Sequence, residues 1–419
     1  MKNSVAVLII LSVAASGLTQ PQPGDVFREY RWTHVTGDAG GSLRVGGRLG
    51  TTNWGTQIIN GCWQTPDIEL VHEFELEGAV KAEINIEKIL CHEDTRGLAI
   101  SVNGGDWIVI PEAGNIPEPQ WSYQHHIYPT VPLSLHELKE GTGNYFCLKV
   151  DTTHTWNWPQ NLIYGVHFRV YYDPDKVNHP SGRILKPRSG EMVGQMADLE
   201  IEAACDYDRI KEVDYVGLYD DVNWEGDGIY RQWHGHFYHG DLIHHIGTTK
   251  TAPYRLRWDT SWLPDQELPM QIAARIVDDS GMIYMTEAVT GLGLQREDFS
   301  VELCKPYDVP MKWLTRKGEA EEKFAVNGDP KKAVAARLVW SSWSPGYMNG
   351  VFINGIKVFD SEGPHYKYYD HCVNLSDTTP LVKGTNVLKT GKTPLYDGHM
   401  VHGMEVNWPG IMVLIKYRK

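Results

Sequence analysis

A pair of turns occurs twice along this chain in the same order. An Asn-Gly dipeptide flanked by apolar residues occurs at Asn103-Gly104 and again at Asn354-Gly355. Asn-Gly favours the two-residue type I′ turn of a β-hairpin, because both turn residues must adopt positive φ. A turn containing glycine and threonine and ending in asparagine follows each hairpin, at residues 141–144 and 383–386. These two segments predict an internal repeat.

Two further landmarks follow in both segments. Asn-Trp-Pro occurs at residues 157–159 and 407–409, and each copy closes with an apolar stretch, at 166–172 and 411–417. The spacing between the landmarks differs from one copy to the other. The repeat is therefore expected to consist of two diverged domains rather than a solenoid of identical units.

Strand periodicity dominates the rest of the chain. Residues 80–87 alternate apolar and polar side chains, which predicts a strand with one buried face. We find no long segment with the period of a helix. A chain of 419 residues is too long for one hydrophobic core, so two or three domains are expected. The sequence therefore predicts an all-β protein of several domains.

Charge and aromatic content narrow the classes of ligand. The net charge of −14 argues against a nucleic-acid partner, whose phosphates require a basic surface. It also argues against a polyanionic polysaccharide, unless the total hides a local basic cleft. The 15 Trp and 21 Tyr residues outnumber the 9 Phe residues. Rings with a polar handle suit wet apolar surfaces such as those that bind sugars, although most are expected to pack within strands.

The N-terminal residues 1–20 have the pattern of a signal peptide. A short basic start at Lys2 precedes an apolar stretch from Val5 to Val13 and small residues at Ala15-Ser16-Gly17. No other segment approaches the roughly 18 apolar residues of a spanning helix. The mature protein is therefore expected to be secreted or periplasmic, without a membrane span. The six cysteines are widely spaced, so disulfides and free thiols are both compatible with the spacing.

Part of the chain resembles known families. Ala252-Pro253-Tyr254, Trp258-Asp259-Thr260 and residues 273–281 are similar to the Ig-like modules of secreted bacterial glycan-active proteins. The two repeat copies, with their Asn-Gly hairpins and later Gly-Thr-containing turns, resemble the galactose-binding-like jelly roll. The resemblance implies a jelly roll at 25–175, an Ig-like β-sandwich at 183–298 and a second jelly roll at 299–419. It implies a link to carbohydrate but no particular activity.

An acidic segment in the middle region resembles the opening of a calcium-binding loop. Asp221–Asp227 places oxygen-bearing residues at alternate positions with a glycine sixth, which is what a hard cation needs in a tight turn. Calcium is therefore a candidate cofactor, with Asp221, Asn223 and Asp227 as ligands. Glu225 at the fifth position and Gln232 at the twelfth depart from the usual pattern. A solvated acidic turn is the alternative.

A second metal hypothesis concerns a histidine-rich stretch. His234 and His236 would share one face of a strand, a spacing that zinc or copper accepts when a third ligand comes from elsewhere. No cysteine or glutamate stands nearby at a recognised zinc spacing. A hairpin with surface histidines and packed rings is the alternative. The stretch contains His234, His236, His239, His244 and His245.

The sugar site is predicted in the loops that precede the two closing strands. These loops combine large rings with carboxylate and imidazole groups, which a sugar needs for its C–H face and its hydroxyls. Trp156 is the preferred stacking ring, because it has no counterpart in the second copy. The alternative is that the repeated tryptophans plug the ends of the sandwiches. The candidate ligand-binding residues are Asp151, His154, Trp156, Trp158, Glu405 and Trp408.

Three classes of function remain open. A secreted carbohydrate-recognition protein is favoured, because the chain lacks a nucleophile elbow, a phosphate loop and a dinucleotide fingerprint. A glycan-cleaving enzyme that uses carboxylates at a jelly-roll domain interface is the alternative. A cell-surface structural protein is a second alternative. The sugar, its linkage and the oligomeric state do not follow from the sequence.

Overall fold

A computed structural model describes residues 21–34, 41–46, 56–90, 97–112, 114–151, 160–375 and 377–419. Within these ranges the protein is built from strands, which confirms the predicted all-β class. The described helices are short 3-10 turns, and none is long and apolar enough to cross a membrane. The 3-10 turns are η1 (Gln120–Ser122), η2 (Leu135–Glu137), η3 (Pro330–Lys332) and η4 (Pro345–Tyr347).

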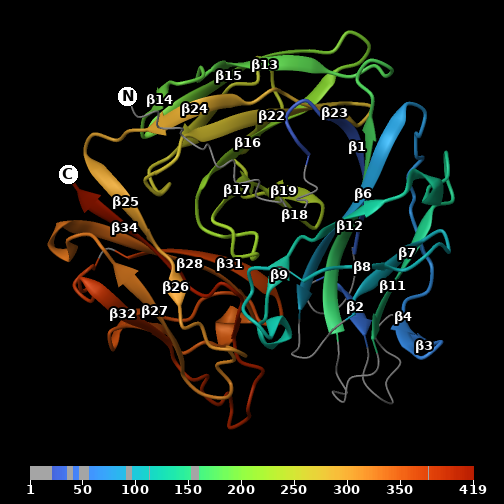
Figure 1. Cartoon of the computed structure of the whole chain (residues 1–419). Coiled ribbons are helices and arrows are strands. Elements are labelled where there is room, and N and C mark those ends of the chain that lie inside the picture. The colour runs from blue at the N-terminus through green and yellow to red at the C-terminus, as the bar shows by residue number, and fades with distance from the viewer. Residues whose placement is uncertain are drawn as a thin grey trace, which may run out of the picture.

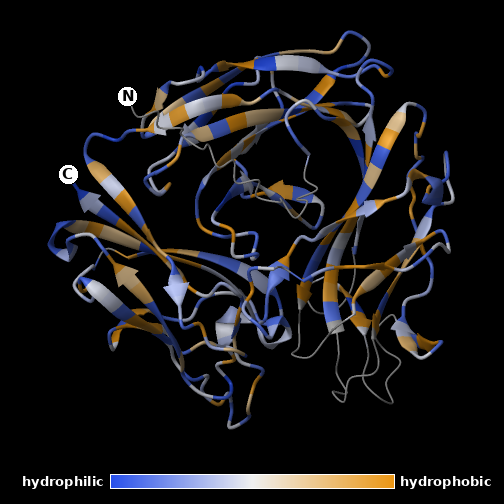
Figure 2. Cartoon of the chain, in the orientation of Figure 1, coloured by the Kyte–Doolittle hydropathy of each residue, from blue (hydrophilic) through white to orange (hydrophobic). Residues whose placement is uncertain are grey.

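We divide the strands into a first part (β1–β12), a middle part (β13–β24) and a third part (β25–β34). The hairpin β18–β19 of the middle part lies near the centre of the molecule (Figure 1). The hairpin consists of β18 (His236–Tyr238) and β19 (Asp241–Ile243). Apolar and polar residues alternate along many of the strands (Figure 2), as expected for sheets with one face in a core. The residue limits predicted for the domains, and their jelly-roll and Ig-like types, stay predictions.

One sheet of 13 strands runs through both the first and the middle parts, in the order β10-β6-β12-β1-β23-β22-β16-β17 with side branches. Its continuity depends on β1, which pairs with β12 along its length and with β23 from Val26 to Arg28. The strands of this sheet are β1 (Val26–Thr33), β2 (Leu43–Gly46), β6 (Ala79–Leu90), β9 (His126–Ile127), β10 (Thr130–Leu133), β12 (Gln160–Tyr172), β14 (Met192–Val193), β16 (Ile210–Asp220), β17 (Arg231–His234), β20 (Gly247–Thr249), β22 (Met270–Asp278), β23 (Met282–Met285) and β24 (Val289–Leu294).

Smaller sheets complete the cores of the first and middle parts. In the first part, Ile84 and Phe168 of the long sheet pack against Ile100 and Phe146 of a six-stranded sheet. In the middle part, the long sheet packs against a three-stranded sheet, and Tyr215 of the long sheet belongs to the core between them. The added strands are β3 (Gln57–Ile59), β4 (Cys62–Gln64), β5 (Ile68–Glu69), β7 (Ala99–Val102), β8 (Ile108–Val109), β11 (Tyr145–Asp151), β13 (Ser181–Lys186), β15 (Met196–Ala204) and β21 (Leu256–Asp259).

The third part is a sandwich of two five-stranded sheets around a core that contains Trp340 and Phe324. One sheet has the order β25-β34-β28-β31, and the other has the order β26-β27-β32-β29-β30. The strands are β25 (Phe299–Cys304), β26 (Pro306–Tyr307), β27 (Ala320–Val326), β28 (Ala333–Trp343), β29 (Val351–Ile353), β30 (Ile356–Phe359), β31 (Tyr368–Leu375), β32 (Gly384–Thr390), β33 (Glu405–Val406) and β34 (Met412–Arg418).

The predicted repeat is confirmed by matching strand orders and matching hydrogen bonds. The order β1-β12-β6-β10 in the first part corresponds to β25-β34-β28-β31 in the third. Asn103 and Asn354 both adopt positive φ in their hairpin turns, at 50° and 49°. Asn103 Nδ2 donates to Asn144 Oδ1 at 2.8 Å, and Asn354 Nδ2 donates to Asn386 Oδ1 at 2.8 Å. The Asn-Gly turns and the later turns that end in Asn144 and Asn386 are therefore structurally equivalent, whereas the first Asn-Trp-Pro landmark, at 157–159, lies outside the described residues.

Candidate functional site

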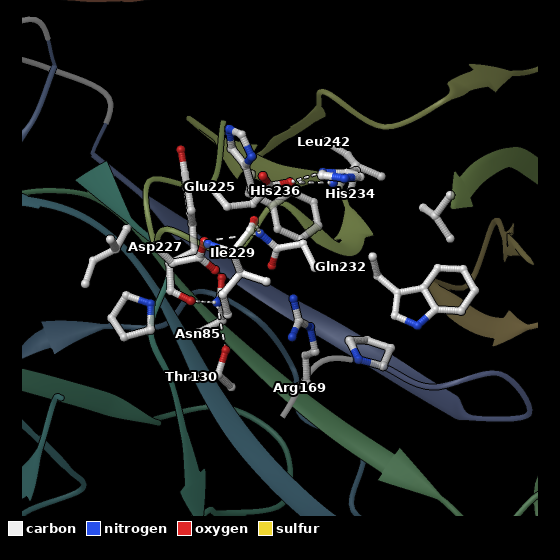
Figure 3. A pocket seen from close by; sticks show the side chains of 18 of the residues that line it. Asn85, Thr130, Arg169, Glu225, Asp227, Ile229, Gln232, His234, His236 and Leu242 are labelled. Carbon is white, nitrogen blue, oxygen red and sulfur yellow. Dashed lines mark hydrogen bonds and ion pairs between the residues drawn. The ribbon is translucent and has the colours of Figure 1, made fainter. Parts of the chain in front are cut away.

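A cleft of about 680 Å³ lies between the first and middle parts, beside the central hairpin β18–β19. One face of the continuous sheet contributes to its lining, through Glu29, Asn85 and Arg169 of the first part and Arg275 of the middle part. The segment from 225 to 242 supplies much of the remainder. Figure 3 shows how its labelled side chains lie around the opening.

The polar face of the predicted strand at 80–87 faces this junction rather than water. Glu83, Asn85 and Glu87 are all buried, although their alternation with apolar residues is typical of a strand with a solvated face. Asn85 Nδ2 donates to the carbonyl oxygen of Tyr128 at 3.0 Å and to Thr130 Oγ1 at 2.9 Å (Figure 3). The turn of the hairpin β18–β19 meets this face, where the His239 amide donates to Glu87 Oε2 at 3.0 Å. This polar face is therefore part of the candidate site.

An ion network binds the cleft side of the first part to the middle part. Glu29 is paired with three arginines: Oε1 lies 2.8 Å from Arg169 Nε, Oε2 lies 2.8 Å from Arg275 Nη2, and Oε2 also contacts Arg31 Nη2. Arg169 also contacts Glu83 at 3.0 Å, and Arg275 contacts Asp214 at 3.3 Å. Burial alone would raise the pKa of Glu29, but the neighbouring arginines hold it well below its usual range. The carboxylate of Glu29 is therefore ionised and fully paired.

A second buried ion pair joins Glu225 to His234. Glu225 Oε1 lies 3.1 Å from His234 Nδ1, and the carbonyl oxygen of Tyr219 lies 3.0 Å from His234 Nε2. Because both ring nitrogens face oxygen acceptors, the geometry favours the imidazolium form. Burial would lower the pKa of His234, but Glu225 outweighs burial and raises it to about 9. Burial would likewise raise the pKa of Glu225, but His234 lowers it.

Asp227 is fixed at the edge of the cleft by neutral donors. Its Oδ1 accepts hydrogen bonds from Asn223 Nδ2 at 2.7 Å, the Ile229 amide at 2.8 Å and Gln232 Nε2 at 3.2 Å. Burial and then the charge of Glu225 raise the pKa of Asp227 to about 6. The pKa of Asp227 is therefore raised whereas that of Glu225 is lowered, although both carboxyl groups line the same cleft.

The loop predicted to bind calcium connects the three parts of the molecule. A Cβ atom at Gly226 would lie 2.0 Å from the carbonyl oxygen of His126 in the first part. The Asn223 amide lies 3.2 Å from Met412 Sδ in the third part. Asn223 Oδ1, a predicted calcium ligand, accepts a hydrogen bond from the Gly228 amide at 2.7 Å. Calcium in this loop stays a prediction.

Aromatic rings gather on the hairpin side of the cleft. Tyr128 stacks between His236, at 4.2 Å between centroids, and His126, at 4.9 Å. Phe237 is covered by the guanidinium of Arg31 at 4.1 Å and by the ring of His167 at 4.8 Å. Trp233 also lines the cleft and is only partly buried. Trp233 is therefore the cleft ring best placed to offer a face to a ligand.

A buried junction of the three parts lies behind the cleft. His126 Nε2 is 3.7 Å from Glu87 Oε1, and the ring of Tyr368 stands edge-on to His126 at 4.3 Å between centroids. Burial raises the pKa of Glu87 well above its usual range and lowers that of His126 to about 3. Burial therefore favours the uncharged form of both groups. Tyr238 of the central hairpin also contacts this junction through His126.

The histidine-rich stretch does not place its first two imidazoles together. Gly235, with φ of 128°, separates β17 from β18, so His234 contacts Glu225 whereas His236 contacts Tyr128 and His244. Within the described ranges, no three His, Cys, Asp or Glu side chains converge closely enough to hold a metal ion. The five described cysteines, at 62, 147, 205, 304 and 372, are free thiols.

The predicted sugar-site residues are only partly described. His154, Trp156 and Trp158 lie outside the described residues, and so does the side chain of Asp151. Glu405 is buried in β33, and the Trp408 ring contacts Tyr123 of the first part at 5.4 Å between centroids. Neither Glu405 nor Trp408 lines the cleft. Their role in sugar binding stays a prediction.

The sequence patterns include only some of the cleft residues. Asp227 is a predicted calcium ligand, and His234 belongs to the histidine-rich stretch. Arg169, Arg275 and Tyr128 belong to none of the predicted sites. The available signal was the presence of charged residues at alternate positions of long strands, such as His167 and Arg169 in the closing strand of the first copy.

Comparisons with known proteins do not place the chain in a family. No family model matches it, and no curated protein matches it significantly. The fibronectin(III)-like modules of Clostridium thermocellum CbhA are 12% identical, over 46% of this chain and 78% of theirs, with a TM-score of 0.19. A β-porphyranase of glycoside hydrolase family 86 from Bacteroides plebeius is 11% identical, with a TM-score of 0.21.

That match to the porphyranase covers 53% of this chain and 35% of the enzyme, so the chain spans about a third of its length. Tandem CBM51 modules of a family 98 glycoside hydrolase from Streptococcus pneumoniae are 10% identical, over 85% of this chain and 81% of theirs. Their TM-score is 0.17. At such scores, these likenesses carry no argument about the function of this chain.

Proposed function

We propose that this chain binds carbohydrate in the cleft between its first and middle parts. The observation that carries the proposal is the composition of the lining, which combines the partly exposed ring of Trp233 with directional groups of Asn85, Thr130 and Gln232. A sugar presents a C–H face to a ring and hydroxyl groups to polar side chains. A volume of about 680 Å³ falls in the range of ligand pockets.

Trp233 is the proposed stacking ring. The faces of Tyr128 are occupied by two imidazoles, and those of Phe237 by Arg31 and His167. Trp233 packs against the buried cluster around Val216 while remaining partly exposed. One side of the indole can therefore stay in the core while the other meets a ligand.

A glycan panel followed by calorimetry tests this function. The wild-type protein should bind at least one glycan, and Trp233→Ala should weaken that binding by at least tenfold. Trp233→Phe should keep most of the affinity, because a ring face remains. Trp107→Ala is the matched control, since Trp107 is partly buried and lies outside the cleft. Absence of binding to every glycan, or unchanged binding by a folded Trp233→Ala variant, would overturn the proposal.

A second candidate function is glycan cleavage at the same cleft. It is favoured by Glu225 and Asp227, two lining carboxyl groups whose pKa values are shifted in opposite directions. In hydrolysis, one carboxylic acid protonates the leaving glycosidic oxygen while a carboxylate assists attack at the anomeric carbon, with consumption of one water. Asp227, with a pKa of about 6, would be the acid and Glu225 the carboxylate.

Measurement of new reducing ends separates cleavage from binding. If the chain is an enzyme, a bound glycan should yield reducing ends, and the rate should fall as pH rises above about 6, because Asp227 must be protonated. Asp227→Asn should then abolish release while binding persists. Binding without release at any pH would leave recognition as the function.

Export to the periplasm or the medium remains part of the proposal, because residues 1–20 lie outside the described ranges.

A further inference from the structure

We infer that the cleft accepts an uncharged glycan segment and rejects uronate and sulfate groups. This inference rests on the proposed carbohydrate function and names the ligand class of the same site. Its basis is the charge arrangement of the lining, in which the cationic side chains already have anionic partners and several neutral or acidic groups keep unused acceptor oxygens.

The two arginines of the lining are not available to an anionic ligand. Arg169 is held by Glu29 and Glu83, at 2.8 and 3.0 Å, and Arg275 by Glu29 and Asp214, at 2.8 and 3.3 Å. Both arginine side chains are only 7% exposed. Binding of a sugar carboxylate would therefore require one of these buried pairs to break, which leaves a protein charge uncompensated.

The imidazolium of His234 and the carboxylate of Glu112 in the lining are also paired. His234 is paired with Glu225 at 3.1 Å. Glu112 is paired with Lys88 at 2.9 Å, and its Oε2 also lies 2.9 Å from His125 Nε2. Among the described residues that line the cleft, no arginine, lysine or protonated histidine lacks a carboxylate partner. A basic cleft hidden within the net charge of −14 is therefore absent at this site.

Unused oxygens of the lining suit the hydroxyl groups of a sugar. Among the described residues, the hydrogen bonds of the Asn85 and Gln232 side chains use their N–H groups, and none reaches Asn85 Oδ1 or Gln232 Oε1. The hydrogen bonds from described residues to the Asp227 carboxyl all reach Oδ1, so its Oδ2 is a third acceptor. Hydroxyl groups can donate to these oxygens, whereas a carboxylate or sulfate cannot.

A panel of oligosaccharides of equal length tests the inference by calorimetry. The panel contains neutral glucans, mannans, xylans and galactans, together with oligogalacturonate and sulfated galactan. We expect binding among the neutral members alone, with less than a twofold change in Kd between 50 and 500 mM NaCl. Tighter binding of a uronate or sulfated member would overturn the inference but keep the glycan function. Failure of every member to bind would overturn the function itself.

A charge variant gives an independent test. Glu29→Gln removes the shared partner of Arg169 and Arg275, so the folded variant should gain at least tenfold in affinity for the anionic members and become sensitive to salt. Asp214→Asn, which removes one of the two carboxylate partners of Arg275, serves if Glu29→Gln does not fold. Glu202→Gln is the matched control, because it removes one carboxylate from an exposed pair with Arg183. A folded variant without any gain in anion binding would contradict the inference.

Discussion

His234 Nδ1 lies 3.1 Å from Glu225 Oε1 in a site where both side chains are buried. This pairing makes the stability of the protein depend on pH. With a pKa of about 9 in the folded state and 6.5 when unperturbed, His234 stabilises the fold fully below pH 6.5. The stabilisation should decline as pH rises through the interval from about 6.5 to about 9, by up to about 1.4 kcal/mol per pH unit.

Urea unfolding between pH 6 and 9.5 measures this dependence. His234→Gln should flatten the decline in the free energy of unfolding, because glutamine does not titrate. His136→Gln, at an exposed position, is the control and should leave the slope as in the wild type. An equally steep decline in His234→Gln would show that other groups cause it.

Asn144→Ala and Asn386→Ala should each destabilise the protein by roughly 2–4 kcal/mol. Asn144 accepts from the Lys139 amide and from Asn103, and donates to the Lys139 carbonyl; Asn386 makes the same bonds with Val382 and Asn354. Both asparagines are fully buried, so their loss leaves several polar groups without partners. Thermal and urea unfolding check the prediction, which a cost below about 1 kcal/mol at either position would contradict.

Gly226→Ala should separate the 221–228 loop from the first part. The added Cβ would lie 2.0 Å from the His126 carbonyl oxygen, so the backbone must shift. We expect a loss of about 1–3 kcal/mol beyond that of the control Gly190→Ala. Gly190 has φ of 80° and open space around its Cβ position, so it reports the backbone strain alone. Equal losses in the two variants would mean that the contact is not tight.

The calcium hypothesis predicts a lower melting temperature in chelator. An ion bound only to the folded state stabilises it by mass action, so EDTA should lower Tm and added Ca²⁺ should restore it. Asn223→Ala should remove that response. A Tm that is the same in EDTA and in Ca²⁺ would reject the site and leave the loop as a hydrogen-bonded connector between the parts of the molecule.

Local chemistry explains which features of the fold could be predicted. Asn103 and Asn354 form their turns because Asn-Gly tolerates positive φ, a property visible in two adjacent residues. Alternation along residues 80–87 likewise identified a strand. What covers the polar face of that strand could not be predicted, because it depends on pairing between residues far apart, such as Val26 and Tyr284.

The candidate site had the same limitation. The segment from Asp221 to Asp227 attracted attention for its spacing of oxygen-bearing side chains, and its Asp227 does line the cleft. Its relation to Arg169 and Arg275 depends on the sheet that joins the first and middle parts. The spacing of residues within one segment contains no information about which distant strands lie beside it. The sequence therefore indicates which side chains could bind an ion, but not that they line a cleft.

The pairing of β1 with both β12 and β23 has a mechanical consequence. Swinging the first part away from the middle part would break the backbone ladder at Val26, Phe27 and Arg28 and the bonds between residues 24–25 and Met285. These backbone hydrogen bonds therefore fix the two walls of the cleft relative to each other. The width of the cleft would be the same before and after a glycan binds, so the cross-section of the glycan chain, including its branches, would determine whether it fits.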